Sequence, residues 1–133
     1  MELRETLRGY VQQINTVAAE TGMPMMRPTF LAFPEDPVCA NKSAEAQFML
    51  GPDWLVSPVT AAPTSWPVYL PAPDPGSEWV YWWNQTSVPP SDIGVWHNIS
   101  VAAIADFPLF HRHNILPPEF RIACQSCNCI VQQ

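Results

Sequence analysis

The first twenty residues carry apolar side chains at the spacing of an amphipathic helix. Charged and amide side chains fill the positions between the apolar ones, which are Leu3, Leu7, Tyr10, Val11, Ile14, Val17 and Ala18. This period places the apolar side chains on one helix face. Gly22 follows, and glycine commonly ends helices. The pattern predicts a helix over about residues 2–20 whose apolar face packs against a core.

Residues 25–33 form a short apolar run that is closed by Pro34 and Pro37. A bounded apolar run of this length predicts a buried strand. A helix followed by a buried strand is the repeating unit of an α/β barrel or a doubly wound sheet. This chain contains one such unit.

After Pro37 the pattern changes to short extended segments between proline-rich turns. The segments span residues 48–58, 66–70, 78–83, 95–101 and 107–110, with connectors such as residues 71–76 and 88–91. Several short strands with turn signals between them predict a small β-sandwich. The expected fold class is therefore mostly β, with one helix and one strand before the sandwich.

The composition supports a folded chain rich in extended structure. The 133 residues are 47% hydrophobic and include 16 prolines against 5 glycines. Many prolines favour short extended segments over a helical bundle. The length suits one domain or pieces of two. It does not accommodate a whole enzyme barrel, which takes roughly 250 residues.

The charge pattern argues against two classes of partner. Six basic residues stand against twelve acidic ones, for a formal net charge of −6, and the basic residues are scattered. Without a basic patch, neither nucleic acid nor an anionic membrane surface is an expected partner. No run approaches the roughly 20 apolar residues of a membrane span. The first ten residues also lack the apolar core of a signal peptide.

Four cysteines are present, and three of them cluster near the end of the sequence as Cys124, Cys127 and Cys129. A structural zinc site usually takes four ligands, commonly in two well-separated pairs. His111 and His113 could complete a set, but three clustered thiols are a weak signal. We therefore predict neither a metal site nor a cofactor.

Five blocks of the sequence, taken in order, resemble glycoside hydrolase family 31, the α-glucosidase family. They are MMRPTFLAFPEDP at residues 25–37, QFMLGPDWLVSPV at 47–59, VYLP at 68–71, EWVYWW at 78–83 and PLFHR at 108–112. Ordered blocks carry more weight than a lone motif. The resemblance covers about residues 3–112. It departs at His113 and Asn114, where the family has a small residue and glycine.

The resemblance implies a domain division. Residues 1–36 would be the end of a (β/α)8 barrel, with its last helix and strand. Residues 37–112 would be the proximal C-terminal β-sandwich domain, and residues 113–133 are an unassigned tail. A helix and strand cut from a closed barrel would leave apolar surface without its partners. We therefore expect residues 1–35 to be loosely held in isolation.

The resemblance also implies where the chemistry lies. Retaining glycosidases use two carboxyl groups about 5 Å apart. In family 31 both are aspartates on earlier barrel strands, so no catalytic residue of this chain is expected. Glu35 and Asp36 are adjacent carboxylates, but neighbours in an extended segment point to opposite sides. We expect them to serve turn chemistry.

Trp79, Tyr81 and Trp83 would share one side of a strand, with Val80 and Trp82 on the other. An exposed aromatic face could stack on a sugar, which makes a carbohydrate-binding module the rival hypothesis. Large aromatic side chains more often fill cores. The three histidines, His97, His111 and His113, are expected at the surface or at strand ends.

Three Asn-x-Ser/Thr sequons begin at Asn41, Asn84 and Asn98. Each could accept a glycan if the chain entered the secretory pathway. Many members of the resembled family are lysosomal, lumenal or secreted, which agrees with these sequons.

Three functional hypotheses remain open at this point. The chain could be the C-terminal region of a family 31 glycoside hydrolase, which would meet a carbohydrate substrate only in the full-length enzyme. It could be a non-catalytic β-module that binds carbohydrate or another partner. It could also be an incomplete gene product without independent function.

Overall fold

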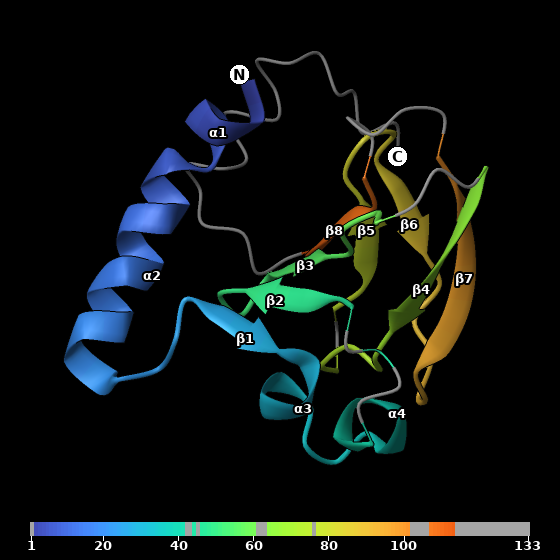
Figure 1. Ribbon diagram of the computed structural model, residues 1–133, viewed down its shortest axis with the longest axis horizontal. Helices are drawn as coiled ribbons and strands as arrows, with labels where there is room; N and C mark the ends of the chain where they lie inside the picture. Colours follow the sequence, from blue (N-terminus) through green and yellow to red (C-terminus); the bar gives the residue numbers. More distant parts are fainter. Residues whose placement is uncertain are drawn as a thin grey trace.

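The computed structural model describes residues 2–41, 44, 46–60, 64–75, 77–101 and 107–113. In these parts of the chain, a six-stranded sheet lies between a helical layer and a two-stranded ribbon (Figure 1).

The N-terminal helix forms as α1, Glu2–Thr6, and α2, Arg8–Thr21. Gly22 ends α2 in the left-handed region at φ 76°, and its N–H donates to the carbonyl of Ala18. Both the helix and its glycine stop are therefore confirmed. The structure adds a turn residue at Leu7. Leu7, Tyr10 and Ile14 are buried, whereas Val11 and Val17 are about one-third exposed.

The prediction of a buried strand over residues 25–33 is wrong. Strand β1, Met26–Pro28, has three residues and lies at an edge of the sheet, and Thr29–Ala32 form the short helix α3. Met26 is 58% exposed. The apolar run looked buried because its side chains are large, but a short run does not distinguish a strand from a helical turn.

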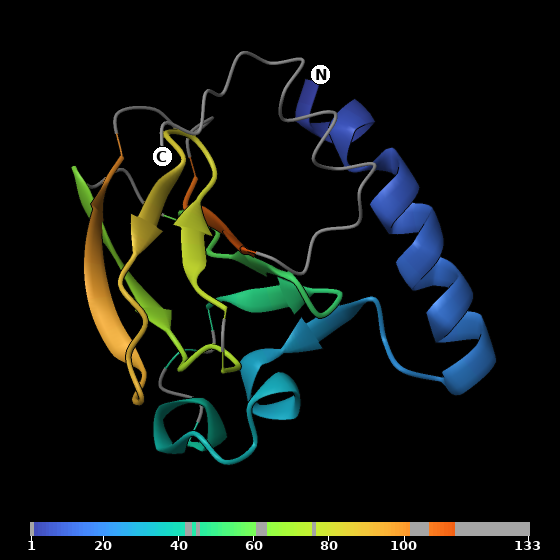
Figure 2. The ribbon, with the colours of Figure 1, turned by 180° about the vertical axis from the view of Figure 1, so that it is seen from behind.

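All pairs in the large sheet are antiparallel, and its order is β1-β2-β3-β8-β5-β6. Its other strands are β2 Phe48–Leu50, β3 Trp54–Val56, β5 Trp79–Tyr81, β6 Thr86–Val88 and β8 Leu109–Arg112. The ribbon pairs β4, Ser65–Leu70, with β7, Val95–Ser100. Figure 2 shows the molecule from the opposite side, where these two strands again lie next to each other. The mostly β fold class is thus confirmed.

The expected segment at residues 48–58 divides into a hairpin, with Gly51 in its turn at φ 61°. Strand β1 pairs antiparallel with β2, so that Met26 lies opposite Leu50 and Pro28 opposite Phe48. The piece assigned to a barrel by resemblance therefore hydrogen-bonds into the same sheet as the sandwich strands. The domain boundary after residue 36 stays a prediction.

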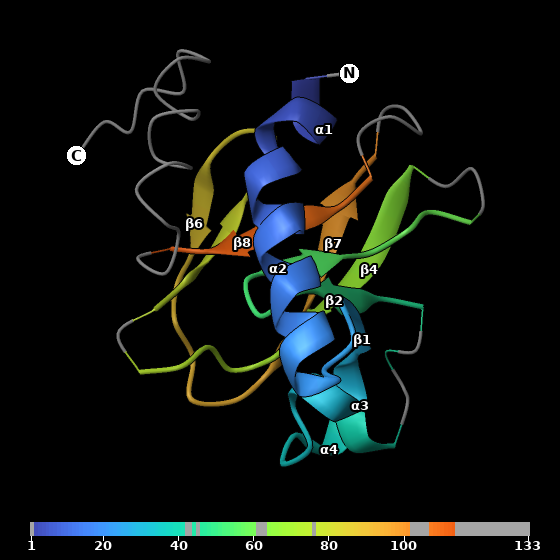
Figure 3. The same cartoon turned by 90° about the vertical axis from the view of Figure 1, so that its left-hand side faces the viewer.

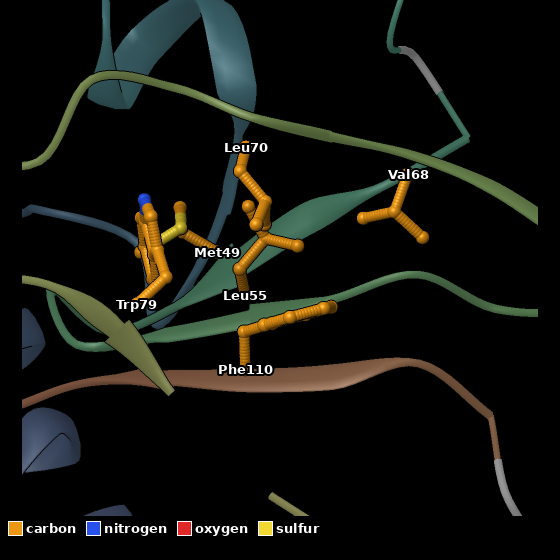
Figure 4. Packing of buried hydrophobic residues seen from close by; sticks show 6 residues of the cluster. All are labelled: Met49, Leu55, Val68, Leu70, Trp79 and Phe110. Carbon is orange, nitrogen blue, oxygen red and sulfur yellow. The ribbon is translucent and has the colours of Figure 1, made fainter. Parts of the chain in front are cut away.

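Two apolar clusters hold the layers together. Between the large sheet and the ribbon, six side chains interlock (Figure 4): Met49, Leu55, Val68, Leu70, Trp79 and Phe110. On the opposite face of the sheet, α2 lies across the strands (Figure 3). There Leu7, Tyr10 and Ile14 pack with Trp54 and Leu109. Both faces of the central strands β3 and β8 are therefore covered.

Candidate functional site

A groove of about 650 Å³ opens where the α3–α4 segment meets β4 and the loop before β7. We call it the acidic groove; it is lined by residues 32–38, 69, 71, 72 and 92–94. Most of the lining is apolar, with Phe33, Pro71 and Ile93 among it. The charged lining side chains are Glu35, Asp36 and Asp92. Within the described parts of the chain, the groove therefore has carboxylates and no basic group.

Asp36 is fixed in this groove by the start of α4, Pro37–Ala40. Its Oδ1 accepts the N–H groups of Val38, at 2.9 Å, and Cys39, at 3.2 Å, which is N-cap geometry. Its Oδ2 accepts the hydroxyl of Tyr69 at 2.8 Å. Burial, followed by the neighbouring Asp36 carboxylate, raises the pKa of Tyr69. The turn role expected of Asp36 is confirmed.

Gly94 brings the loop before β7 against this pair. A Cβ at residue 94 would lie 1.9 Å from the Tyr69 hydroxyl oxygen and 2.8 Å from Oδ2 of Asp36. Only glycine leaves room for this approach. The groove wall therefore depends on a residue without a side chain.

A second cavity, of about 350 Å³, lies beside α2 and is lined by Tyr10, Arg27, Asp53, Asp74 and Arg112, among others. Arg112 pairs with Asp74, and its guanidinium lies 5.3 Å from the ring centre of Phe33 and 5.4 Å from that of Trp79. Burial raises the pKa of Asp53, and the charge of Arg112 opposes that shift. The contacts of Arg112 therefore join the end of β8 to Asp74, Phe33 and Trp79.

The three aromatic residues proposed for sugar stacking do not form one exposed platform. Trp79 is 2% exposed in the core, and its Nε1 donates to the Pro71 carbonyl at 2.8 Å. Tyr81 packs on Phe110, with ring centres 5.1 Å apart. Trp83 lies beyond the end of β5 and is 39% exposed. The strand ends too early to align all three rings, so only Trp83 presents substantial ring surface.

The expectation that all three histidines are at the surface or at strand ends is wrong for His111. Its imidazole is 3% exposed and lies 5.3 Å from the ring centre of Trp54 and 5.8 Å from that of Trp82. Burial lowers its pKa to about 4. Central strand β8 is covered on both faces, which the sequence pattern did not reveal. His97 and His113 are partly exposed.

Sequence reasoning also missed an exposed aromatic side chain. Trp96 on β7 is 47% exposed, and its ring centre lies 5.2 Å from that of Tyr69. Its neighbour Val95 is 38% exposed. The sequence signal was the alternation along residues 95–100, which makes one face of the edge ribbon open to solvent.

The three sequon asparagines are all exposed. Asn41 follows α4, Asn84 lies in the β5–β6 turn and Asn98 is on β7. The Asn84 side-chain oxygen accepts the N–H of Thr86 at 3.0 Å. A glycan at any of these positions stays a prediction.

The thiols and carboxylates in the described parts of the chain form no metal-binding group. Cys39 is a free, fully buried thiol whose pKa is raised to about 11 by burial. Cys124, Cys127 and Cys129 lie outside the described residues, as does almost all of the predicted tail. No helix among the described residues is long and apolar enough to cross a membrane.

Comparison with known families gives one match that covers most of the chain. The family model described as the glycosyl hydrolase family 31 C-terminal domain matches residues 22–116. Alpha-xylosidase A of Aspergillus niger is 35% identical over 122 residues, which are 84% of this chain and 16% of that protein. A sulfoquinovosidase of Escherichia coli is 32% identical over 108 residues, 80% of this chain and 14% of that protein.

Solved structures give the same result. The crystal structure of a family 31 alpha-xylosidase from a soil metagenome, complexed with xylose, superposes with a TM-score of 0.76 at 32% identity. The match covers 92% of this chain and 16% of that one. A xylosidase from Aspergillus niger matches with a TM-score of 0.68 at 32% identity, over 85% of this chain and 17% of that one. This chain thus spans about a sixth of the length of these relatives.

Proposed function

Because this chain belongs to glycosyl hydrolase family 31, in which it matches the C-terminal domain, we propose that it serves as a non-catalytic β-domain of an α-glycosidase. The observation that carries the proposal is the family match over residues 22–116. Relatives named alpha-xylosidase and alpha-glucosidase support α-linked xylosides or glucosides as substrates of the whole enzyme. Cleavage of the glycosidic bond belongs to the region that this chain does not contain.

The carboxylates described here support a structural role. A retaining glycosidase needs a nucleophile and an acid/base carboxyl group about 5 Å apart, flanking the scissile bond. Asp36 has its oxygens bonded to two N–H groups and the Tyr69 hydroxyl. Asp53 is 5% exposed, and Asp74 pairs with Arg112. The contacts of Asp36 and Asp74 hold parts of the domain together, which is a structural use of these two carboxylates.

An apolar edge suggests how the domain joins the rest of the enzyme. It consists of Met23, Met26, Phe30 and Leu31, which lie on and around β1 and α3 and are 39–58% exposed. Clustered exposed apolar side chains mark interaction surfaces. We assign this apolar edge to contact with the catalytic region.

The test is a chimera. Residues 1–133 replace the matching C-terminal region of Aspergillus niger alpha-xylosidase A, and hydrolysis of a chromogenic α-xyloside is measured. The chimera should be soluble and active, whereas the isolated chain should give no turnover above buffer. A folded chimera without activity, or reproducible turnover by the isolated chain, would contradict the proposal.

Trp83 supports a second candidate, a weak carbohydrate-binding function. Its ring is 39% exposed and is held by an Nε1 hydrogen bond to the Phe107 carbonyl at 2.8 Å. A fixed, exposed ring can stack on the apolar face of a sugar. Titration with xylose or maltose should perturb the total tryptophan fluorescence in the wild type and not in Trp83→Ala. Equal responses in both proteins would exclude this residue.

A further inference from the structure

The acidic groove combines a large apolar lining with charge of one sign. Its volume of about 650 Å³ is in the range of occupied binding pockets, which span about 300–1,000 Å³. Phe33, Pro34 and Ile93 contribute apolar surface, and Ile93 is 72% exposed. A water-filled groove with this lining would keep apolar surface in contact with solvent, so covering it is favourable.

The carboxylates select the charge of the occupant. Glu35 and Asp92 are exposed at the groove, and Asp36, which also lines it, accepts the Tyr69 hydroxyl. Two arginines of the described residues form ion pairs away from the groove: Arg8 pairs with Glu5, and Arg112 pairs with Asp74. No basic side chain of the described residues lines the groove, so an arginine or lysine side chain of an occupant would complement its carboxylates.

The lining favours a peptide over a sugar. A sugar site needs hydrogen-bond donors as well as acceptors, to match the hydroxyl groups of the ligand. The Tyr69 hydroxyl already donates to Asp36, and the remaining charged side chains of the groove are acceptors. Proline, phenylalanine and isoleucine side chains instead suit an apolar residue next to a cationic one.

The position of the groove along the chain suggests the source of that peptide. Residues Ala32 and Phe33 of its lining directly follow Phe30 and Leu31 of the apolar edge. Along the chain, the groove lining thus begins where the apolar edge ends. About five-sixths of the length of the relatives lies outside the matched part.

We infer that the acidic groove seats a segment of the remaining family 31 polypeptide in which an arginine or lysine stands beside apolar residues. This inference rests on the proposed function. The segment places its apolar side chain against Phe33 and Ile93 and its cation between Glu35 and Asp92. The groove would then act as the specific, charge-selective part of a larger apolar interface.

The groove chemistry is tested by titrating the ¹⁵N-labelled full chain with acetyl-Leu-Arg-Pro-Leu-amide, followed by amide chemical shifts. The matched control peptide carries glutamate in place of arginine, and maltose forms a third arm. The arginine peptide should shift amides of residues 32–38 and 92–94. Asp92→Lys should weaken this binding about fivefold or more, as expected for a charge at the rim. Ser65→Lys, at an exposed position of β4 outside the groove, should leave it unchanged.

Equal binding of both peptides, no shift in the groove, or selective binding of maltose there would overturn the inference. The chimera with alpha-xylosidase A tests whether the segment in the groove comes from the catalytic region. Its activity reports on the proposed function independently of the groove. In an active chimera the groove should be occupied, so the arginine peptide should no longer shift these amides. Undiminished peptide binding in an active chimera would show that the catalytic region leaves the groove open, and would refute the inference while the proposed function stands.

Discussion

At the scale of single residues, burial changes the chemistry that a side chain can perform. His111 sits on a central strand among Trp54 and Trp82, and its pKa falls to about 4 because burial disfavours the imidazolium. The unfolded chain exposes this imidazole, with a pKa near 6.5. The folded state therefore resists protonation of His111.

This difference predicts a pH dependence of stability. Above about pH 6.5 the imidazole is neutral in both states and costs nothing. As the pH falls toward 4 the unfolded state gains a proton first, so the free energy of unfolding should decrease by about 3 kcal/mol from this group. Urea denaturation at pH 7 and pH 4 would measure it. In His111→Phe the decrease should be smaller by that amount; an identical decrease in both proteins would assign the effect to carboxylates.

Gly94 gives a second prediction at this scale. In Gly94→Ala the new methyl group would overlap the Tyr69 hydroxyl, so strand β4 or the loop must move. Overpacking of this kind costs about 1–3 kcal/mol. Gly9→Ala is the matched control, because a Cβ there meets nothing within 4 Å and lies in α2. That change should instead stabilise the protein, by about 0.5–1 kcal/mol. Thermal or urea denaturation of both variants would show whether their effects have opposite signs.

At the scale of elements, α2 is held by tertiary contacts within this chain. The sequence reasoning expected residues 1–35 to be loosely held without a barrel. In the structure the Tyr10 hydroxyl donates to the Leu50 carbonyl at 2.9 Å and accepts the Asp53 N–H at 3.2 Å. Ile14 packs in the same cluster as Trp54. The six-stranded sheet thus offers α2 a partner within this chain.

We therefore predict that α2 is protected from hydrogen exchange as part of the domain. Ile14→Ala should reduce the free energy of unfolding by about 2–5 kcal/mol, because it removes buried methyl groups. Val17→Ala, at a 37% exposed position of the same helix, should change it by less than about 1 kcal/mol. If α2 amides of the wild type exchanged at the rate of an unfolded peptide, α2 would not be packed on the sheet in solution. Residues 1–35 would then be loosely held, as the sequence analysis expected.

At the scale of the whole molecule, the described residues leave both the apolar edge and the acidic groove exposed. A domain that normally packs against a much larger region should expose such surfaces when it is alone. We expect the isolated chain to self-associate at high concentration through the apolar edge.

The double change Met26→Ser and Leu31→Ser tests this expectation. Both side chains are substantially exposed, so the stability of the fold should change by less than about 1 kcal/mol. Sedimentation velocity should show a smaller fraction of oligomers in the variant than in the wild type. In the chimera the same changes should lower activity or stability, since they remove contacts with the catalytic region. Unchanged association and an unaffected chimera would show that this surface is not an interface.

The sequence by itself determined the features that depend on neighbouring residues. Helical spacing and Gly22 set the helix and its end. Short extended segments between turn signals located β4, β5 and β7, and the ordered motifs gave the resemblance to the family. Only the tertiary structure decided which strands pair and which side chains are buried. Strand β8 lies between β3 and β5, from which it is separated by long stretches of chain, and this placement buries His111 and Trp79. Periodicity reports the faces of an element, whereas its partners are fixed by long-range packing, and this is why β1 and the acidic groove could not be read from the sequence.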